Sequence, residues 1–418
     1  MTETQEPRVV FDRLLAKTHV QHALVQPGGR YNEIPSALAT LLFLDEEPCR
    51  FQATYDSMKG EMAPWGPSPR SIADEEAKSQ FLGDDRFQRA FMTYFSMENG
   101  RFAGNSKALA ISHLFSGDTP LIYGLFSGIG RPLTLLSDGI ELRTAILVME
   151  SLTLSAVADF MEPMRELLTP THSPTPTNER RLLSPEEILH RIAYDGRLSG
   201  VMKAGPGFHG VAHIFAHPPA RAAVAEYVAC LDTRGGPALV LQQLAALSVL
   251  LLCATHKPPG GGQQPAAFDL YLGRLPTCVN SARVLLVMML EKQWVEEESH
   301  KVLLVRALWL VVVLVYITQL RPVIDGTLLV SKELAEERRG WECIFEKGRG
   351  GQAGLEPEGK CSHDLSLMRV LRSLRELSKA YGTVHGRLYF HAAWKLANQW
   401  REWTGLGRDR EVMLNIRL

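Results

Sequence analysis

The sequence predicts an all-α protein that folds as a single large multi-helix domain spanning residues 1–418. Apolar residues recur at helical spacing through most of the chain, and strong helix-start signals precede several of these stretches. Strand-like alternation of apolar and polar residues is nearly absent. With 418 residues, 45% of them hydrophobic, the chain is long and apolar enough to bury a large core.

The amino-terminal third contains several helix signals in succession. Residues 34–44 are apolar with small side chains, and residues 45–48 (Asp-Glu-Glu-Pro) mark the start of the next helix, because acids and a proline favour the first turn. Residues 84–95 place four aromatic side chains on one helical face. We expect residues 139–168 to form one long helix.

The later helices begin with a clear capping signal. Ser184 can act as the N-cap residue, Pro185 suits the first helical position, and two acids follow. The remaining helices are expected at residues 237–255, 268–292, 301–320, 364–381 and 389–403. The most apolar run, residues 307–317, is far shorter than the roughly 20 residues that a bilayer requires. We therefore expect a core helix there and no membrane span.

Three proline- or glycine-rich stretches interrupt the helical pattern. They cover residues 169–183, 257–266 and 348–360, and their composition is typical of mobile surface loops. None of them separates two hydrophobic cores, which favours one domain.

Charge and cysteine content exclude several classes of function. Lys and Arg number 45 against 46 Asp and Glu, and without a basic run this balance predicts no binding to nucleic acid. The six cysteines are scattered, so we expect structural thiols rather than disulfides or a zinc site. Residues 1–10 are polar, without the apolar segment of a secretory signal, which predicts a cytoplasmic protein. The sequence carries no signal for an oligomeric state.

No familiar catalytic signature is present. The glycines of residues 125–130 follow no strand and have no later acidic partner, so they predict a turn between helices rather than a nucleotide site. His209, His213 and His217 recur at four-residue spacing and could hold a metal if they shared a helical face. Prolines flank these histidines and no carboxylate supports them, so a loop or surface role is the default interpretation.

Charged residues in apolar surroundings are stronger candidates for a site. Arg131, Thr134 and Asp138 interrupt one apolar stretch, and Arg274 interrupts another. Such side chains must be paired, solvated or directed into a binding site. Structural ion pairs are the more frequent explanation.

Four blocks of sequence together resemble the questin oxidase family of fungal secondary metabolism. Residues 31–42 (Tyr-Asn-Glu-Ile-Pro-Ser-Ala-Leu-Ala-Thr-Leu-Leu) resemble its amino-terminal Asn-His-x-x-His helix start. Residues 105–141 resemble its central His-Pro-Leu-Ile-His-Leu-Gly-Tyr-Gly-x-Glu block. Residues 268–277 and 362–369 resemble the third and the late blocks. The blocks follow in the family's order and cover most of the chain.

The resemblance implies an enzyme that acts on aromatic polyketides such as anthraquinones. The family is described as opening rings with oxygen, by Baeyer–Villiger-type oxidation or at a histidine-rich iron centre. In this chain the family's histidine positions are taken by other residue types, namely Glu33, Ser36, Arg131, Leu135 and Arg274. The late lysine falls on Ser366, and His363 keeps its place.

These replacements change the chemistry that the resemblance implies. Ferrous iron prefers converging imidazoles or carboxylates, and a guanidinium cannot ligate it. Arginine can instead hydrogen-bond and polarise a carbonyl or carboxylate. We therefore expect neither a metal nor another cofactor. The predicted catalytic residues are Arg131, Arg274, Glu33 and His363, and the predicted substrate-binding residues are Asn32, Thr134, Asp138 and Tyr123.

The leading hypothesis is a cofactor-free enzyme that binds a hydrophobic polycyclic terpenoid or polyketide. It would promote cyclisation or rearrangement, such as a Diels–Alder-type pericyclic step, by holding a reactive conformer. One alternative is a metal- or NADPH-dependent oxygenase, as the family implies, with a metal on the three closely spaced histidines. A second alternative is a non-catalytic binding partner of another pathway enzyme.

Overall fold

The computed structural model describes residues 6–159, 161–169, 181–203, 205–255, 268–291, 298–329, 340–350 and 364–406. The three predicted loops lie almost wholly outside these ranges, and so do His363 and Cys361. The described chain is built from helices joined by short connections, with only two-residue strands, which confirms the all-α prediction.

The helices of the first half run from α1 to α9. Their bounds are α1 (Pro7–Gln21), α2 (Ile34–Phe43), α3 (Pro48–Met58), η1 (Lys59–Glu61), α4 (Glu75–Gln80), η2 (Asp85–Phe87), α5 (Gln88–Arg101), α6 (Ser106–Phe115), η3 (Leu121–Tyr123), α7 (Ser127–Glu141), α8 (Ala145–Ala156) and α9 (Met161–Leu168). As predicted, α3 begins with a proline at its first position, and the four aromatic side chains of residues 84–95 are buried.

The second half continues with longer helices. Their bounds are α10 (Pro185–Tyr194), η5 (Gly196–Leu198), α11 (Gly210–Ala216), α12 (Pro218–Ala229), α13 (Pro237–Cys253), α14 (Leu270–Leu290), α15 (Glu298–Thr318), η7 (Gly326–Leu329), α17 (Trp341–Gly348), α18 (Leu365–His385) and α19 (Leu388–Gln399). The N-cap predicted at Ser184 is present, and Ser184 also forms a capping box with Glu187 through reciprocal hydrogen bonds.

One predicted helix is wrong. Residues 139–168 form the end of α7, all of α8 and α9 rather than one long helix. Arg143, between α7 and α8, has φ +53°, a left-handed conformation that ends a helix and turns the chain. Gly139 of α7 then lies so close to Val148 of α8 that a Cβ would approach the valine side chain to 2.8 Å. The tight packing of the two helices explains the break.

Two short strand pairs tie distant segments together. Strands β1 (Val25–Gln26) and β2 (Arg30–Tyr31) form an antiparallel hairpin that leads into α2. Strands β3 (Phe268–Asp269) and β4 (Trp403–Thr404) pair in parallel, so a late segment of the chain is fixed at the start of α14.

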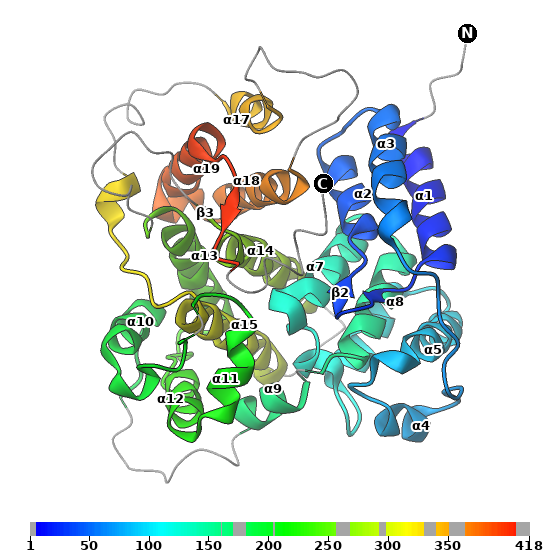
Figure 1. Cartoon of the computed structure of the whole chain (residues 1–418), viewed down its shortest axis with the longest axis horizontal. Helices are drawn as coiled ribbons and strands as arrows, with labels where there is room; N and C mark the ends of the chain where they lie inside the picture. Colours follow the sequence, from blue (N-terminus) through cyan, green and yellow to red (C-terminus); the bar gives the residue numbers. More distant parts are fainter. Residues whose placement is uncertain are drawn as a thin grey trace.

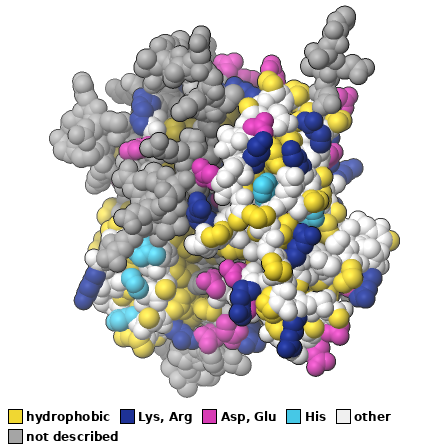
Figure 2. Space-filling model, turned by 45° about the vertical axis from the view of Figure 1, so that its right-hand side comes forward, with side chains coloured by type: hydrophobic (Ala, Val, Ile, Leu, Met, Phe, Trp, Pro, Cys, Tyr) yellow, Lys and Arg dark blue, Asp and Glu magenta, His cyan; other side chains and the backbone are white. Residues whose placement is uncertain are grey.

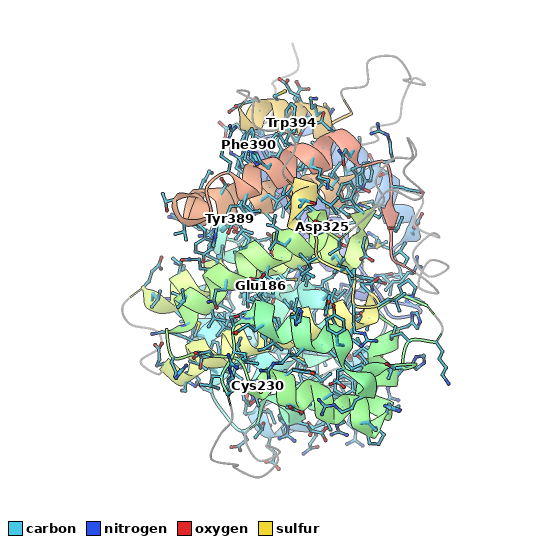
Figure 3. All side chains as sticks on the ribbon, turned by 90° about the vertical axis from the view of Figure 1, so that its left-hand side faces the viewer. Glu186, Cys230, Asp325, Tyr389, Phe390 and Trp394 are labelled. Carbon is cyan, nitrogen blue, oxygen red and sulfur yellow. The ribbon has the colours of Figure 1, made fainter. Side chains whose placement is uncertain are left out.

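Figure 1 shows α1 to α5 on the right of the view and α10 to α13 on the left, with α7 and α14 near the middle. Helix α14 packs on α7, α13, α15 and α18. The buried apolar side chains of the described residues form one connected core. Figure 3 shows Phe390 of α19 near one end of the molecule. Trp341 of α17 meets Phe390 edge-on, at a ring-centroid distance of 5.5 Å.

Helix α15 lies close to the expected residues 301–320, and it extends beyond the most apolar run, residues 307–317. By length and composition alone, its 21 residues could cross a membrane. However, 78% of its apolar window is buried inside the protein. Burial against other helices, rather than a short apolar run, supports the predicted position in the core.

Outside the residues drawn in grey, the face in Figure 2 shows acidic and basic side chains interspersed, without an extended area of one sign. Three of the five cysteines in the described ranges, Cys230, Cys253 and Cys278, are buried, as expected of structural thiols.

Candidate functional site

The site is built around a left-handed turn at the start of α7. Gly128, Ile129 and Gly130 have φ values of +55°, +57° and +68°, which confirms the predicted turn. Glycine adopts this conformation freely, whereas a β-branched isoleucine adopts it only at a cost of about 1–2 kcal/mol. A strained residue of this kind persists because its surroundings hold it in place.

Neighbouring elements press closely on both glycines. A Cβ on Gly128 would lie 2.8 Å from the ring of Tyr31, and a Cβ on Gly130 would lie 2.7 Å from Sγ of Cys278. The backbone of the turn is therefore in contact with the β1–β2 hairpin on one side and with α14 on the other.

Side chains also bind the three successive carbonyl oxygens of this turn. The hydrogen bonds run from Arg274 Nη1 to Gly128 O (3.4 Å), from Cys278 Sγ to Ile129 O (2.9 Å) and from Thr134 Oγ1 to Gly130 O (2.9 Å). Burial raises the pKa of the Cys278 thiol to about 12, so this thiol is a neutral donor rather than a nucleophile. Thr134, predicted to bind substrate, thus stabilises the turn.

Arg131 follows the turn directly and pairs with Glu33 at the start of α2. Both terminal nitrogens of Arg131 donate to the two carboxylate oxygens of Glu33, and the guanidinium carbon lies 5.6 Å from the centre of the Tyr31 ring. Burial and the positive charge of Arg274 lower the pKa of Arg131. The carboxylate of Glu33 supplies the compensating charge, and the structure brings these two predicted residues together.

A second ion pair links α18 to α7, and its arginine also contacts α2. Arg369 of α18 donates to Asp138 of α7 at 2.5 Å, and also to Thr40 Oγ1 (2.9 Å) and Ser36 O (3.1 Å) of α2. Burial raises the pKa of Asp138, and the charge of Arg369 opposes this shift. Asp138 was predicted to contact the substrate, but its described contact is this structural ion pair.

Arg274 differs from the other two arginines. It lies half-buried on α14, and its one described hydrogen bond goes to the carbonyl of Gly128. No carboxylate lies within ion-pair distance of its guanidinium among the described residues, whereas Arg131 and Arg369 each have one. Burial lowers the pKa of Arg274, and the nearby charge of Arg369 lowers it further.

Tyr31 is a member of the site that the sequence analysis did not select. Burial and the charge of Asp159 raise the pKa of Tyr31, while Arg131 and Arg274 oppose the shift, so the phenol stays protonated. Arg369 and Cys278 were also missed. Tyr31 and Arg369 do stand within the blocks that carry the family resemblance, but only the packing of α2, α7, α14 and α18 near the middle of Figure 1 brings them to the turn.

Three other predicted residues are not joined to this cluster. The side-chain oxygen of Asn32 accepts a hydrogen bond from the Ile34 amide (3.0 Å), so Asn32 supports the start of α2. Tyr123 lies on η3, and its described electrostatic neighbour is Arg165 of α9. His363 lies outside the described residues.

The closely spaced histidines do not share one helical face. Helix α11 contains only His213, while His209 and His217 flank it as cap residues. The rings of His209 and His213 lie 6.1 Å apart, and Nδ1 of His217 accepts a hydrogen bond from the Ala220 amide at the start of α12. Their spacing therefore does not produce the stacked arrangement that a metal half-site requires.

The residues at the turn do not fit the iron centre that the family resemblance implies. Guanidinium groups cannot ligate a cation, the carboxylate of Glu33 is engaged by Arg131, and the Cys278 thiol is protonated. No group of three His, Cys, Asp or Glu side chains suited to a metal occurs in the part of the chain that the structure describes. The donor set is instead suited to binding an oxygen atom.

Comparison with known proteins adds a family match. A family model described as "Questin oxidase-like" matches residues 31–374, a range that includes Tyr31 and all three arginines of the site. The questin oxidase of Aspergillus terreus (strain NIH 2624 / FGSC A1156) is 26% identical over 159 residues, covering 36% of this chain and 35% of that protein. The alignment thus spans about a third of the curated relative.

Proposed function

The chain belongs to the questin oxidase-like family, and from this premise we propose that it is an enzyme of fungal secondary metabolism. Its substrate is a hydrophobic polycyclic small molecule, a polyketide or a terpenoid. The family match and the curated relative, which is named an oxidase, support an enzyme. The arginines beside the turn, at positions where the resemblance implies histidines, support a reaction that uses hydrogen bonds in place of a metal.

The proposal rests on one observation, the surroundings of Arg274. Arg274 is half-buried, its guanidinium contacts the carbonyl of Gly128 in the left-handed turn, and it has no carboxylate partner among the described residues. A donor held in place before the reaction stabilises charge that develops on a substrate oxygen, without the cost of reorganising solvent. Arg274 would therefore polarise a carbonyl of the bound molecule.

The reaction would be a cofactor-free cyclisation or rearrangement, such as a Diels–Alder-type pericyclic step. Drawing electron density toward a carbonyl oxygen activates the conjugated system attached to it. Holding the molecule in one folded conformer removes much of the entropic barrier to ring closure. The Arg131–Glu33 pair holds both of its side chains in place beside the turn, because each partner fixes the other in a bidentate geometry.

An oxygenase is the second candidate, because the curated relative is named questin oxidase. In that case the chain would transfer oxygen to the ring system of its substrate, with a cofactor bound away from the arginines. The two candidates differ in whether oxygen is consumed and in the mass of the product.

The test is conversion of candidate polycyclic intermediates by the full chain, followed by mass spectrometry of the products with and without oxygen. Anaerobic conversion to an isomer of unchanged mass, reduced roughly 100-fold or more in Arg274→Met, would support the proposal. Arg234→Met is the matched control, since Arg234 is exposed and paired with Asp232. Conversion that requires oxygen and adds oxygen mass would establish the oxygenase, and full activity of Arg274→Met would rule out this site.

A further inference from the structure

The charges of the arginine cluster do not balance. We define this cluster as Arg131, Arg274, Arg369, Glu33 and Asp138. The two carboxylates pair with Arg131 and Arg369, which leaves the positive charge of Arg274 uncompensated within the described residues. Partial removal of a guanidinium from water is unfavourable unless a counter-charge or several acceptors replace the lost hydration, and the one carbonyl that Arg274 contacts at 3.4 Å is a weak replacement.

A second hydrogen-bond donor lies beside Arg274. The Tyr31 hydroxyl would be 3.1 Å from a Cβ placed on Gly128, the residue whose carbonyl Arg274 contacts. No described residue hydrogen-bonds this hydroxyl, and Tyr31 and Arg274 influence each other electrostatically. The guanidinium and the phenol therefore approach the same glycine, and the Tyr31 ring packs where its side chain would be.

We infer that Arg274 and Tyr31, which both lie beside Gly128, together bind an anionic oxygen of the ligand, a carboxylate or an ionised phenol or enol on a polycyclic framework. This inference rests on the proposed function and narrows its substrate class. An anion restores the charge balance of the cluster, whereas a neutral carbonyl does not. The other two arginines are not available for this role because their guanidiniums are already engaged by carboxylates.

The two donors have complementary parts in this site. The guanidinium supplies the charge and a planar pair of N–H groups that matches two oxygen atoms. The protonated phenol donates one O–H, which satisfies a further lone pair of the same anion. The ring of Tyr31 also contacts Arg131 through its face, so the position of the hydroxyl is coupled to the Arg131–Glu33 pair.

The experiment measures binding of 2-naphthoate and of its neutral isostere 2-naphthamide to the full chain by titration calorimetry. We expect the naphthoate to bind at least about tenfold more tightly than the amide, because a hydrogen bond to a charged group is worth about a factor of ten or more. Arg274→Met should remove this preference, and Tyr31→Phe should weaken naphthoate binding several-fold. Arg234→Met, at an exposed ion pair, should bind like the wild type.

A second probe distinguishes a carboxylate from an ionised phenol. The ionised form of 4-nitrophenol absorbs visible light, so its binding as the anion appears as colour retained at lower pH than in free solution. Binding of either probe in an Arg274-dependent way supports the inference, and the tighter of the two identifies the anion. Arg274→Lys guards against misfolding of the methionine variant, since it keeps the charge but loses the planar pair of donors.

Two outcomes would overturn the inference: equal affinity for naphthoate and naphthamide together with no Arg274-dependent binding of the nitrophenolate, or binding of both anionic probes that is unchanged in Arg274→Met and Tyr31→Phe. Binding and conversion together distinguish failure of this inference from failure of the proposed function. Arg274-dependent anion binding without conversion of any intermediate would keep the site and remove the reaction. Conversion of a neutral substrate that naphthoate does not inhibit would keep the reaction and remove the anion site.

Discussion

Replacing Glu33 by glutamine tests whether the arginine cluster depends on its carboxylates. The substitution keeps the shape of the side chain but leaves Arg131 without a counter-ion, next to two further guanidiniums. Breaking a buried ion pair from one side costs about 3–5 kcal/mol. The side chain of Arg131 is 9% exposed but that of Glu33 is 28% exposed, so water offsets part of this loss and we expect about 2–3 kcal/mol.

The double variant isolates the interaction between the two side chains. In Glu33→Gln, the further substitution Arg131→Met removes the uncompensated charge, so it should destabilise the protein much less than Arg131→Met does in the wild type. The coupling free energy of this cycle should be at least about 2 kcal/mol. The matched control is the same pair of substitutions at Glu162 and Arg165, an exposed pair expected to yield less than about 1 kcal/mol.

The assay is equilibrium unfolding in guanidinium chloride, followed by circular dichroism and by tryptophan fluorescence on all four proteins of each cycle. Coincident transitions with the two probes permit the free energies to be compared. A coupling free energy at Glu33 and Arg131 no larger than that of the exposed control pair would refute the argument that burial makes this pair important.

Two further predictions concern the turn and the start of α14. Gly128→Ala should destabilise the protein by about 1–2 kcal/mol or more, because alanine resists the left-handed conformation and its Cβ meets Tyr31. The control is Gly60→Ala, which should be near neutral in the same unfolding assay because nothing lies within 4 Å of its Cβ. Burial raises the pKa of Asp269 to about 6 from 3.8, so the folded state binds the extra proton between these values and stability falls as pH rises through them. Measured by denaturant unfolding, the stability of the wild type relative to Asp269→Asn should fall by up to about 3 kcal/mol from pH 4 to pH 7, and a difference that stays constant with pH would contradict this assignment.

Helix positions were the part of the fold most accessible from sequence. Local signals such as the capping box at Ser184 and the proline of α3 act within a few residues, so they predict helix starts without knowledge of the fold. The break after α7 was missed because its cause is tertiary. Nothing local marks Arg143 as left-handed, and the turn there is set by the packing of Gly139 against α8.

The candidate site likewise contains some residues that the sequence could identify and others that only the fold reveals. Arg131 and Arg274 could be selected because charged residues stand out in apolar segments, and the family resemblance added Glu33. Asp138 stood out for the same reason, yet its partner Arg369 lies 231 residues away, so sequence alone could not separate a structural pair from a ligand contact. Tyr31 was missed because its role depends on the hairpin that places its ring against the turn.

The left-handed turn also fixes the position of α14 along α7. Two of its carbonyls are bound by Arg274 and Cys278 of α14, and Gly130 leaves no space between α7 and that cysteine. A slide of α14 by one residue, a rise of about 1.5 Å, would disrupt these contacts together. The spacing of Arg131 and Arg274 is thus fixed largely by main-chain geometry, so a change of either side chain leaves the distance between the two positions in place.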